Sequence, residues 1–402
     1  MMRLFLNGLA ASAGGGLTYL RNVIPELALR ADVETTVLLG AAFRREFDSV
    51  ANVTFLEEPD SRSAPRRFLR EQKILPALLR RAGAQVLISA GNFALWNAPV
   101  PQILLSRNSL YTSVDFLRDV RARHDYAIWA DTKLKALFAR QSIRRADLTI
   151  APSEAFAREL AAWSGREVVA LHHGFNAEAF ESDPKPLPIV QGQLAEGQGA
   201  LRLLFVSHYN YYRNFETLFR AIPLLKKVLP GRKVKLYLTC RLDSLENPGT
   251  YRAEHASSLV SELRADHDIV ELGAIPYGSL HHLYRACDIY VTPAYAESFA
   301  HPLVEAMSSG LPVVASDLPV HREICDGAAV YFPRFSPEEL ADRIVQLQAD
   351  RASVSRLSEA GRARAKEFSW RTHVARLVER ATEVAGGERT RNEVPEQARP
   401  GL

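Results

Sequence analysis

Short apolar runs alternate with longer amphipathic stretches along most of the chain, and this alternation limits the possible folds more than any other feature. In the first half the apolar runs lie at residues 3–6, 35–39, 86–89, 101–105, 148–151 and 168–171. Amphipathic stretches lie between them, for example at 17–30, 69–82 and 153–163. Strand-length runs separated by helix-length stretches are typical of βαβ units, so we predict a parallel sheet with helices on both faces.

The same alternation starts again after a segment of different composition. Residues 181–200 contain three Pro and three Gly with few large apolar side chains, which favours an interdomain linker. Further apolar runs follow at 201–207, 233–239, 268–273, 288–293 and 312–316. At roughly 100–200 residues per domain, 402 residues fit two α/β domains, which we place at 1–185 and 186–369.

Three helical patterns and a polar end complete the sequence. Residues 337–348, 352–367 and 370–385 are amphipathic at helical spacing. Almost no apolar residue occurs from Gly386 onward, so we predict a flexible tail over 386–402.

Composition excludes several classes of protein. Apolar residues make up 47% and charged residues 24%, as in a soluble globular chain, and a net charge of +4 does not by itself indicate nucleic-acid binding. The cysteines Cys240, Cys287 and Cys325 lack zinc-binding or redox spacing, which favours a reducing compartment. No run approaches the roughly 18 apolar residues of a membrane span, and the run at 4–6 is too short for a signal-peptide core. We therefore expect a cytoplasmic protein.

Residues 62–81 form a basic amphipathic stretch that leaves two interpretations open. Its cations are interleaved with apolar side chains: Arg66, Arg67, Arg70, Lys73, Arg80 and Arg81 alternate with Leu69, Ile74, Leu75, Leu78 and Leu79. The stretch is either a solvated helix that covers the sheet or a peripheral contact with an anionic surface at the inner face of the membrane.

The segment 296–307 carries the strongest chemical signal. Glu297 follows the apolar run at 288–293, and Glu305 comes eight residues later in the first turns of the next predicted helix. Open parallel sheets bind ligands beyond the carboxyl ends of their strands, and a helix N-terminus favours an anion. One carboxylate could accept hydrogen bonds from sugar hydroxyls and the other could hold a ribose diol. An acidic loop followed by a helix-start glutamate would have the same spacing.

This segment resembles the E-x7-E motif of the retaining nucleotide-sugar glycosyltransferases called glycosyltransferase family 4. The resemblance continues at 310–317 and at Pro319, Arg322 and Glu323. Further matches are the nucleotide-base loop at 273–277, the next helix at 280–288, the strand, phosphate loop and helix at 203–225, the glycine-rich acceptor-side loop at 14–20, the segments 151–154 and 173–176 that close the first domain, and 368–370 before the last helix. The resemblance covers about residues 3–385.

The resemblance implies the GT-B architecture, in which two Rossmann-like α/β domains face each other across a cleft. The second domain binds most of the donor, and the last helix, here 370–385, returns to the first domain. Two residues receive catalytic roles: Glu297 would hold the transferred sugar, and Arg213 would neutralise the diphosphate leaving group. The implied donor-binding residues are Glu305 at the ribose, the backbone of Phe299, Ala300 and His301 at the sugar and phosphates, Ser207 and His208 in the phosphate loop, and Ile275 in the base loop.

The chain departs from the family pattern at two donor positions. Ser207 and His208 stand where the family usually has Gly and then Arg, so a second diphosphate cation is missing unless His208 is protonated. Ala300 stands where the family usually has glycine, which would alter close packing against the sugar.

On the acceptor side, Gly15 and Gly16 allow close backbone approach to a ligand. Many family members have a histidine after a central strand of the first domain, and this chain has none there. Asn108 or Arg107 could take its place, or Asn108 could simply cap a helix. His173, just before Gly174, is a further candidate for the cleft.

We therefore expect a retaining glycosyltransferase that moves a sugar from a nucleotide diphosphate sugar to a glycan or lipid-linked acceptor in surface polysaccharide biosynthesis. We expect no metal ion or other cofactor, because Asp266-His267-Asp268, which could suggest a metal-binding Asp-x-Asp, lies before a strand and away from the predicted cleft. Two alternatives remain: a nucleotide-sugar epimerase of the same architecture, and a catalytically weak homologue that only binds ligand.

Overall fold

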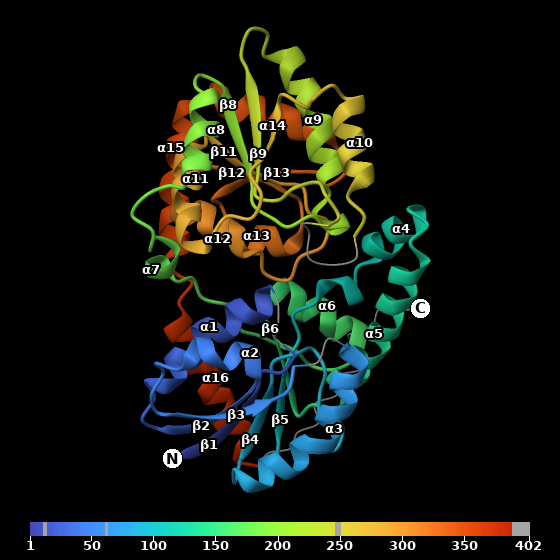
Figure 1. Cartoon of the computed structure of the whole chain (residues 1–402), viewed down its shortest axis with the longest axis vertical. Helices are drawn as coiled ribbons and strands as arrows, with labels where there is room; N and C mark the ends of the chain where they lie inside the picture. The colour runs from blue at the N-terminus through green and yellow to red at the C-terminus, as the bar shows by residue number, and fades with distance from the viewer. Residues whose placement is uncertain (11–13, 61–62, 246–250, 388–402) are drawn as a thin grey trace. The chain divides into compact units, whose positions relative to one another are not determined.

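The computed structural model describes residues 1–10, 14–60, 63–245 and 251–387. The chain packs into two units, each built around its own parallel sheet (Figure 1). The first unit comprises Met1–Thr112, Ala130–Gly174 and the chain from Ser369, and the second comprises Ser113–Trp129 and Phe175–Phe368. The predicted α/β class with two parallel sheets is confirmed.

The sheet of the first unit has the strand order β3-β2-β1-β4-β5-β6-β7, and the neighbouring strands pair in parallel. Its strands are β1 (Met2–Asn7), β2 (Val33–Gly40), β3 (Val53–Glu58), β4 (Val86–Ser89), β5 (Gln102–Leu105), β6 (Leu148–Ala151) and β7 (Val169–Ala170). Strand β3 has no counterpart among the predicted apolar runs. It lies at the sheet edge, where half-exposed and charged side chains hide the strand signal.

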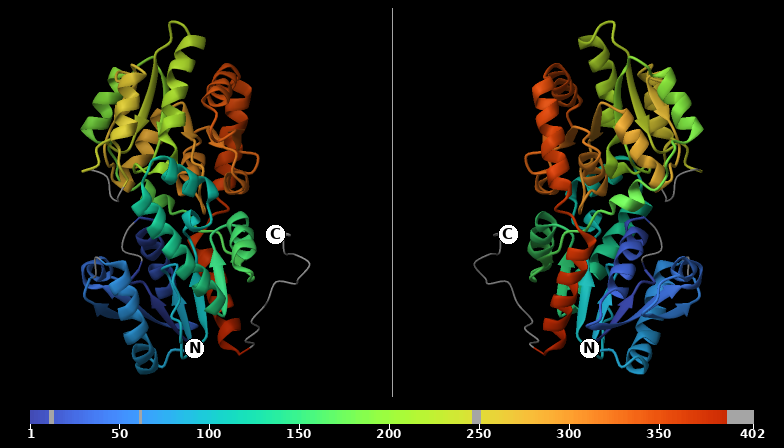
Figure 2. Two further views of the ribbon diagram at one scale, coloured as in Figure 1. Left: turned by 90° about the vertical axis from the view of Figure 1, so that its right-hand side faces the viewer. Right: turned by 90° about the vertical axis from the view of Figure 1, so that its left-hand side faces the viewer.

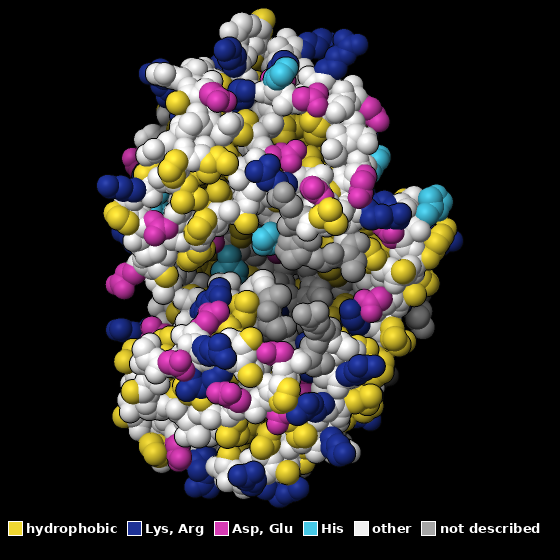
Figure 3. Space-filling view, in the orientation of Figure 1, with side chains coloured by type: hydrophobic (Ala, Val, Ile, Leu, Met, Phe, Trp, Pro, Cys, Tyr) yellow, Lys and Arg dark blue, Asp and Glu magenta, His cyan; other side chains and the backbone are white. Residues whose placement is uncertain are grey.

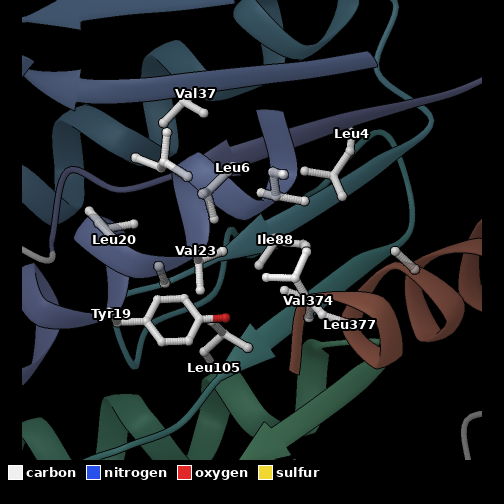
Figure 4. Close-up of a cluster of buried hydrophobic side chains, with 14 of the residues drawn as sticks. Leu4, Leu6, Tyr19, Leu20, Val23, Val37, Ile88, Leu105, Val374 and Leu377 are labelled. Carbon is white, nitrogen blue, oxygen red and sulfur yellow. The ribbon is translucent and has the colours of Figure 1, made fainter. Parts of the chain in front are cut away.

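Helices cover both faces of this sheet. The helices and 3-10 turns of the first unit are α1 (Gly15–Ala28), α2 (Ala41–Arg44), η1 (Arg45–Phe47), α3 (Ala64–Arg81), η2 (Ser109–Tyr111), α6 (Glu154–Ser164), α16 (Trp370–Ala385) and the part of α5 (Tyr126–Arg145) from Ala130 onward. On one face, Leu6 and Ile88 of the sheet pack against Val23 of α1 and Leu377 of α16 (Figure 4). Helix α16 therefore packs in the first unit, alongside α1 (Figure 2).

Helix α3 covers the other face of the first sheet. Its Leu75 and Leu79 are buried in a cluster with Phe5 of β1, because apolar residues four apart share one face of a helix. The opposite face is exposed, including Leu69, and Lys and Arg side chains gather over this part of the unit (Figure 3). The helix thus covers the sheet as the first interpretation of 62–81 requires, while membrane contact through its exposed face remains a prediction. Residues 61–62 lie outside the described part.

The sheet of the second unit has the strand order β10-β9-β8-β11-β12-β13, again with parallel neighbours. Its strands are β8 (Leu201–Phe205), β9 (Val234–Leu238), β10 (Ile269–Glu271), β11 (Ile289–Thr292), β12 (Val313–Ser316) and β13 (Ala329–Phe332). The edge strand β13 is missing from the predicted runs although all four of its residues are apolar; in the sheet its first three residues are half-buried.

Helices also lie on both sides of this second sheet, with α11 and α12 on one side and α9 and α10 on the other (Figure 1). The helices and 3-10 turns of the second unit are α4 (Val114–Ala122), the start of α5, α7 (Ala177–Phe180), α8 (Pro188–Glu196), η3 (Tyr211–Arg213), α9 (Phe215–Val228), α10 (Glu254–Glu262), η4 (Tyr277–Ser279), α11 (Leu280–Ala286), α12 (His301–Ser308), α13 (Pro319–Cys325), α14 (Pro337–Ala349) and α15 (Arg351–Ala365).

The linker prediction for 181–200 is wrong, because residues 188–196 of this segment form α8 and the segment packs within the second unit. Pro188 stands in the first turn, where its missing N–H costs nothing. Val190 is buried, and the carbonyl of Gln193 accepts a hydrogen bond from the Tyr237 hydroxyl at 3.2 Å. The helix is thus part of the second unit.

The units divide by packing at Gly174 and Phe175 rather than at 185 and 186, and residues 113–129 pack with the second unit although they precede it in sequence. Of the predicted tail at 386–402, residues 388–402 lie outside the described part of the chain.

Candidate functional site

Two loops at the carboxyl ends of β8 and β11 bring the predicted catalytic residues together in the second unit. Arg213 ends the turn η3 after β8, and Glu297 lies in the loop after β11. The backbone N–H of Tyr295 donates to the carbonyl of Tyr212 at 3.0 Å, which joins the two loops directly. The site thus lies where ligands bind in open parallel sheets.

Asn214 fixes the geometry of the first loop. Its φ of 57° is in the left-handed region, which asparagine tolerates better than most residues. Its side-chain amide donates to the carbonyl of Pro293 at 3.0 Å and to that of Arg334 at 2.6 Å. Arg213 therefore precedes a reversal of the chain that is anchored to the neighbouring loop.

Arg213 and Glu297 form an ion pair in which both side chains are largely shielded, with 20% and 9% of their surface exposed. The Nε atom of Arg213 is buried and has no hydrogen-bond partner among the described residues. Burial lowers the pKa of His321, which also feels the charge of Arg213, to about 4. His321 is therefore neutral near pH 7 and adds no positive charge beside Arg213. The Nε–H of Arg213 can donate to a further anionic group.

The start of α12 follows Glu297 directly. Ala300 has φ 66° and ψ 65°, a left-handed conformation, and Pro302 stands in the first turn. The first turn of the helix contains no acidic side chain, and Ala300 provides no side-chain cap. The N-terminal dipole of α12 is therefore available to an anion. The left-handed backbone also explains why glycine suits position 300.

Glu305 lies on the same helix and is 5% exposed. The Tyr284 hydroxyl donates to its Oε2 at 2.8 Å. Burial raises the pKa of Glu305 to about 7, and this hydrogen bond only partly opposes the shift. Burial and the charge of Glu305 also raise the pKa of Tyr277, which belongs to the turn after Ile275.

The phosphate loop after β8 contains Ser207 and His208. The backbone N–H of Ser207 donates to the Thr239 hydroxyl at 3.1 Å, and the Ser207 hydroxyl donates to the His208 carbonyl at 2.7 Å. Partial burial, and then the charge of Arg213, lower the pKa of His208. The site without ligand therefore disfavours the protonated His208 that would replace the second cation.

The acceptor-side candidates lie in the first unit. Gly15 begins α1, and among the described residues no atom beyond the adjacent chain lies within 4 Å of a Cβ added at Gly14 or Gly15. Gly16 follows within the helix. Asn108 caps η2 by accepting from the N–H of Leu110 at 3.0 Å, as the capping interpretation requires.

Arg107 and His173 both pack against Tyr19. The guanidinium of Arg107 lies 4.6 Å from the centre of that ring, and the His173 ring centre lies 5.3 Å from it. His173 is buried and also stacks on Trp370. These contacts give Arg107 and His173 a role in the packing of the first unit. Whether either residue contacts an acceptor stays a prediction.

Two family models match this chain over separate ranges. The model described as Glycosyltransferase Family 4 matches residues 13–179, and the model described as Glycosyl transferases group 1 matches residues 190–364. Together the two models cover most of the chain, which belongs to the glycosyltransferases that they describe. The predicted glycosyltransferase family and the predicted GT-B fold are confirmed.

Individual relatives of this glycosyltransferase are distant. It is 26% identical over 245 residues to the D-inositol 3-phosphate glycosyltransferase of Nocardia farcinica, which is 60% of this chain and 53% of that protein. The match thus spans about half the length of that curated relative. The sucrose-phosphate synthase of Thermosynechococcus elongatus superposes with a TM-score of 0.73 at 18% identity, covering 96% of this chain and all of that one. Anabaena HepE in complex with UDP-glucose superposes with a TM-score of 0.70 at 17% identity, covering 95% and 100%.

No metal cluster is found in this glycosyltransferase among the described residues, where no three His, Cys, Asp or Glu side chains are grouped. In the Asp266-His267-Asp268 segment, Asp268 pairs with Lys226 at 2.7 Å and Asp266 accepts from the Ser261 hydroxyl at 3.0 Å. No helix in the described part of the chain is long and apolar enough to span a membrane.

Sequence reasoning missed several residues that shape this glycosyltransferase site. Asn214 had a partial signal, because asparagine enters the left-handed region more readily than most residues, although an asparagine directly before a helix usually indicates an extended N-cap. Tyr284 lay in a matched helix, but nothing in the sequence shows that its hydroxyl reaches Glu305. Tyr295, which joins the loops, had no local signal at all.

Proposed function

We propose that this glycosyltransferase is a retaining enzyme that moves a sugar from a nucleotide diphosphate sugar to a glycan or lipid-linked acceptor in surface polysaccharide biosynthesis. The observation that carries the donor part is the Arg213–Glu297 pair beside the N-terminus of α12. A cation and helix-end amides suit the diphosphate of a nucleotide sugar, and a neighbouring carboxylate suits the hydroxyls of its sugar. The acceptor class and retention rest on the family resemblance.

The leaving diphosphate would bind to Arg213 and to the first amides of α12. As the bond from the anomeric carbon to the diphosphate oxygen breaks, negative charge develops on that oxygen, and preorganised cations and amides stabilise it. Glu297, released from Arg213, would accept hydrogen bonds from the sugar hydroxyls. Glu305 would accept hydrogen bonds from the ribose.

In this proposal the diphosphate charge is neutralised without a metal ion. Arg213 and the helix dipole supply positive charge at the place where a divalent cation would otherwise act. Turnover should therefore survive exhaustive treatment with EDTA. Loss of turnover that manganese or magnesium restores would contradict this part of the proposal.

The proposed function is tested first by binding and then by product analysis. A thermal-shift panel of nucleotide sugars should give its largest shift with the true donor, because a ligand of the native state stabilises it by mass action. Transfer from that donor to oligosaccharide and lipid-linked acceptors is then followed by NMR of the anomeric centre. A product with inverted configuration contradicts retention, and a new sugar nucleotide from donor alone identifies an epimerase. Donor binding without turnover identifies a binding homologue.

The proposal includes a peripheral position at the inner face of the membrane, through the exposed side of α3. Arg66, Leu69 and Lys73 lie on that side, which combines cations with an apolar residue. Sedimentation with vesicles should show binding to anionic but not to neutral lipid, and Arg66→Glu with Lys73→Glu should abolish it. Equal binding to both lipids, or none, would leave α3 as a solvated helix.

A further inference from the structure

Helix α4 comes from the first half of the sequence but packs in the second unit, against the turn that carries Arg213. Phe116 and Val120, four residues apart on one face, are fully buried. The Phe116 ring lies 6.3 Å from the ring of Tyr212, the residue before Arg213. The hydroxyl of Ser113 caps the helix by accepting from the N–H of Phe116 at 3.1 Å. An ordered helix thus forms one wall of the loop after β8.

The polar face of α4 is bonded to the loop that carries Glu297. The Tyr295 hydroxyl donates to Oδ2 of Asp119 at 2.6 Å, and Tyr295 is only 4% exposed. The other carboxylate oxygen of Asp119 accepts from Arg123 at 2.8 Å, and Arg123 also pairs with Glu216 at 2.8 Å. Since Tyr295 stands two residues before Glu297, this network limits where the Glu297 carboxylate can lie.

The residues after α4 make the matching contact with the other loop. The Tyr211 hydroxyl donates to Oδ2 of Asp125 at 2.5 Å, and Arg252 pairs with the second oxygen of the same carboxylate. The guanidinium of Arg123 lies 4.3 Å from the centre of the Tyr211 ring. Tyr211 begins the turn that ends at Arg213, so the same segment restrains both members of the ion pair.

We propose that Asp119 and Asp125 are positioning residues, which hold the loops that carry Glu297 and Arg213 in place through Tyr295 and Tyr211. The inference rests on the proposed function. Buried phenol hydroxyls that donate to carboxylates are short, charge-assisted bonds, and breaking one leaves a buried polar group unpaired. Loops released in this way move, and small displacements of reacting groups are costly in rate.

The experiment compares variants that each remove one hydroxyl. Tyr295→Phe should lower kcat about tenfold with the donor KM nearly unchanged, since a 1 Å displacement can cost about a hundredfold. Tyr211→Phe should instead weaken UDP binding about fivefold, because only part of the loss of this charge-assisted bond is passed on to Arg213. The matched control is Tyr237→Phe, which removes a buried hydroxyl bonded to Gln193 outside both loops and should change neither quantity.

Asp119 is tested through its partner. Asp119→Ala loses the bond to Arg123 as well as the bond to Tyr295, so it should lower kcat at least as much as Tyr295→Phe. Adding Tyr295→Phe to Asp119→Ala should cost nothing further, because the bond between the two side chains is already absent. Asp119→Asn keeps an accepting oxygen and should recover most of the turnover. Additive losses, or an Asn variant as poor as Ala, would overturn the pairing.

Hydrogen–deuterium exchange separates this inference from the proposed function. In Tyr295→Phe the amides at 294–300 should exchange at least about fivefold faster, while those of β9 stay unchanged. This readout needs no substrate, so it decides whether Asp119 restrains the loop even if UDP-glucose and other donors are not turned over. Unchanged exchange at 294–300, or unchanged turnover despite faster exchange, would overturn the proposal.

Discussion

The ion pair between Arg213 and Glu297 leads to an unusual expectation for Glu297→Gln: turnover falls while the free nucleoside diphosphate of the true donor, which is UDP if the donor is a UDP-sugar, binds more tightly. Arg213 must leave Glu297 to take the diphosphate. Exposed ion pairs contribute about 0–1 kcal/mol and breaking buried ones costs about 3–5 kcal/mol. This pair, 20% and 9% exposed, lies between them, so we assign it about 1–2 kcal/mol. Removing that competition corresponds to UDP binding about five- to thirtyfold tighter.

The same substitution removes the acceptor for the sugar hydroxyls, so turnover should fall by about a hundredfold or more. Calorimetry with UDP at constant ionic strength measures the first effect, and release of nucleotide from the donor measures the second. Glu262→Gln is the charge-matched control, because Glu262 is an exposed residue of α10. Weaker UDP binding in Glu297→Gln would refute the reasoning, since it would mean that Glu297 supports the nucleotide rather than competing with it.

Three further predictions follow from the same site. Arg213→Ala should lower turnover about a hundredfold or more and Arg213→Lys should be intermediate, because lysine restores charge but not the planar fork; near-normal Arg213→Ala turnover would place the diphosphate elsewhere. Burial raises the pKa of Glu305 from 4.5 to about 7, so the native state binds the extra proton between these values and stability should fall by up to about 3 kcal/mol as pH rises through them. Denaturation across pH 4–8 should show this slope in the wild type and not in Glu305→Gln. Ala300→Gly should stabilise the protein by about 0.5–1 kcal/mol, because relief of left-handed strain exceeds the added entropy of the unfolded chain; a lower midpoint of unfolding would contradict this.

The sequence predicted the central strands of both sheets well and the edges poorly. Strands β1 and β8 are mostly buried and each contains a short apolar run, at residues 4–6 and 203–205, which is typical of strands inside a parallel sheet. Strand β3 has glutamates and half-exposed positions, so its pattern does not differ from that of a loop. Segment 181–200 was predicted to be a linker because of its Pro and Gly residues, whereas residues 188–196 form a helix that packs against Tyr237.

The candidate site divides in the same way between local and distant information. Arg213, Glu297 and Glu305 lie in motifs whose spacing is fixed by one strand, one turn and one helix, so a pattern in the sequence can point to them. The contact of Asp119 with Tyr295 joins residues 176 positions apart, and no local pattern specifies it. An aspartate on an amphipathic helix, four residues before an arginine, is an ordinary surface ion pair by sequence alone. Its second carboxylate oxygen accepts from a buried tyrosine, and this contact makes it a support of the reacting loop. The residues that act on substrate are therefore readable from the sequence, whereas those that hold them in place require the fold.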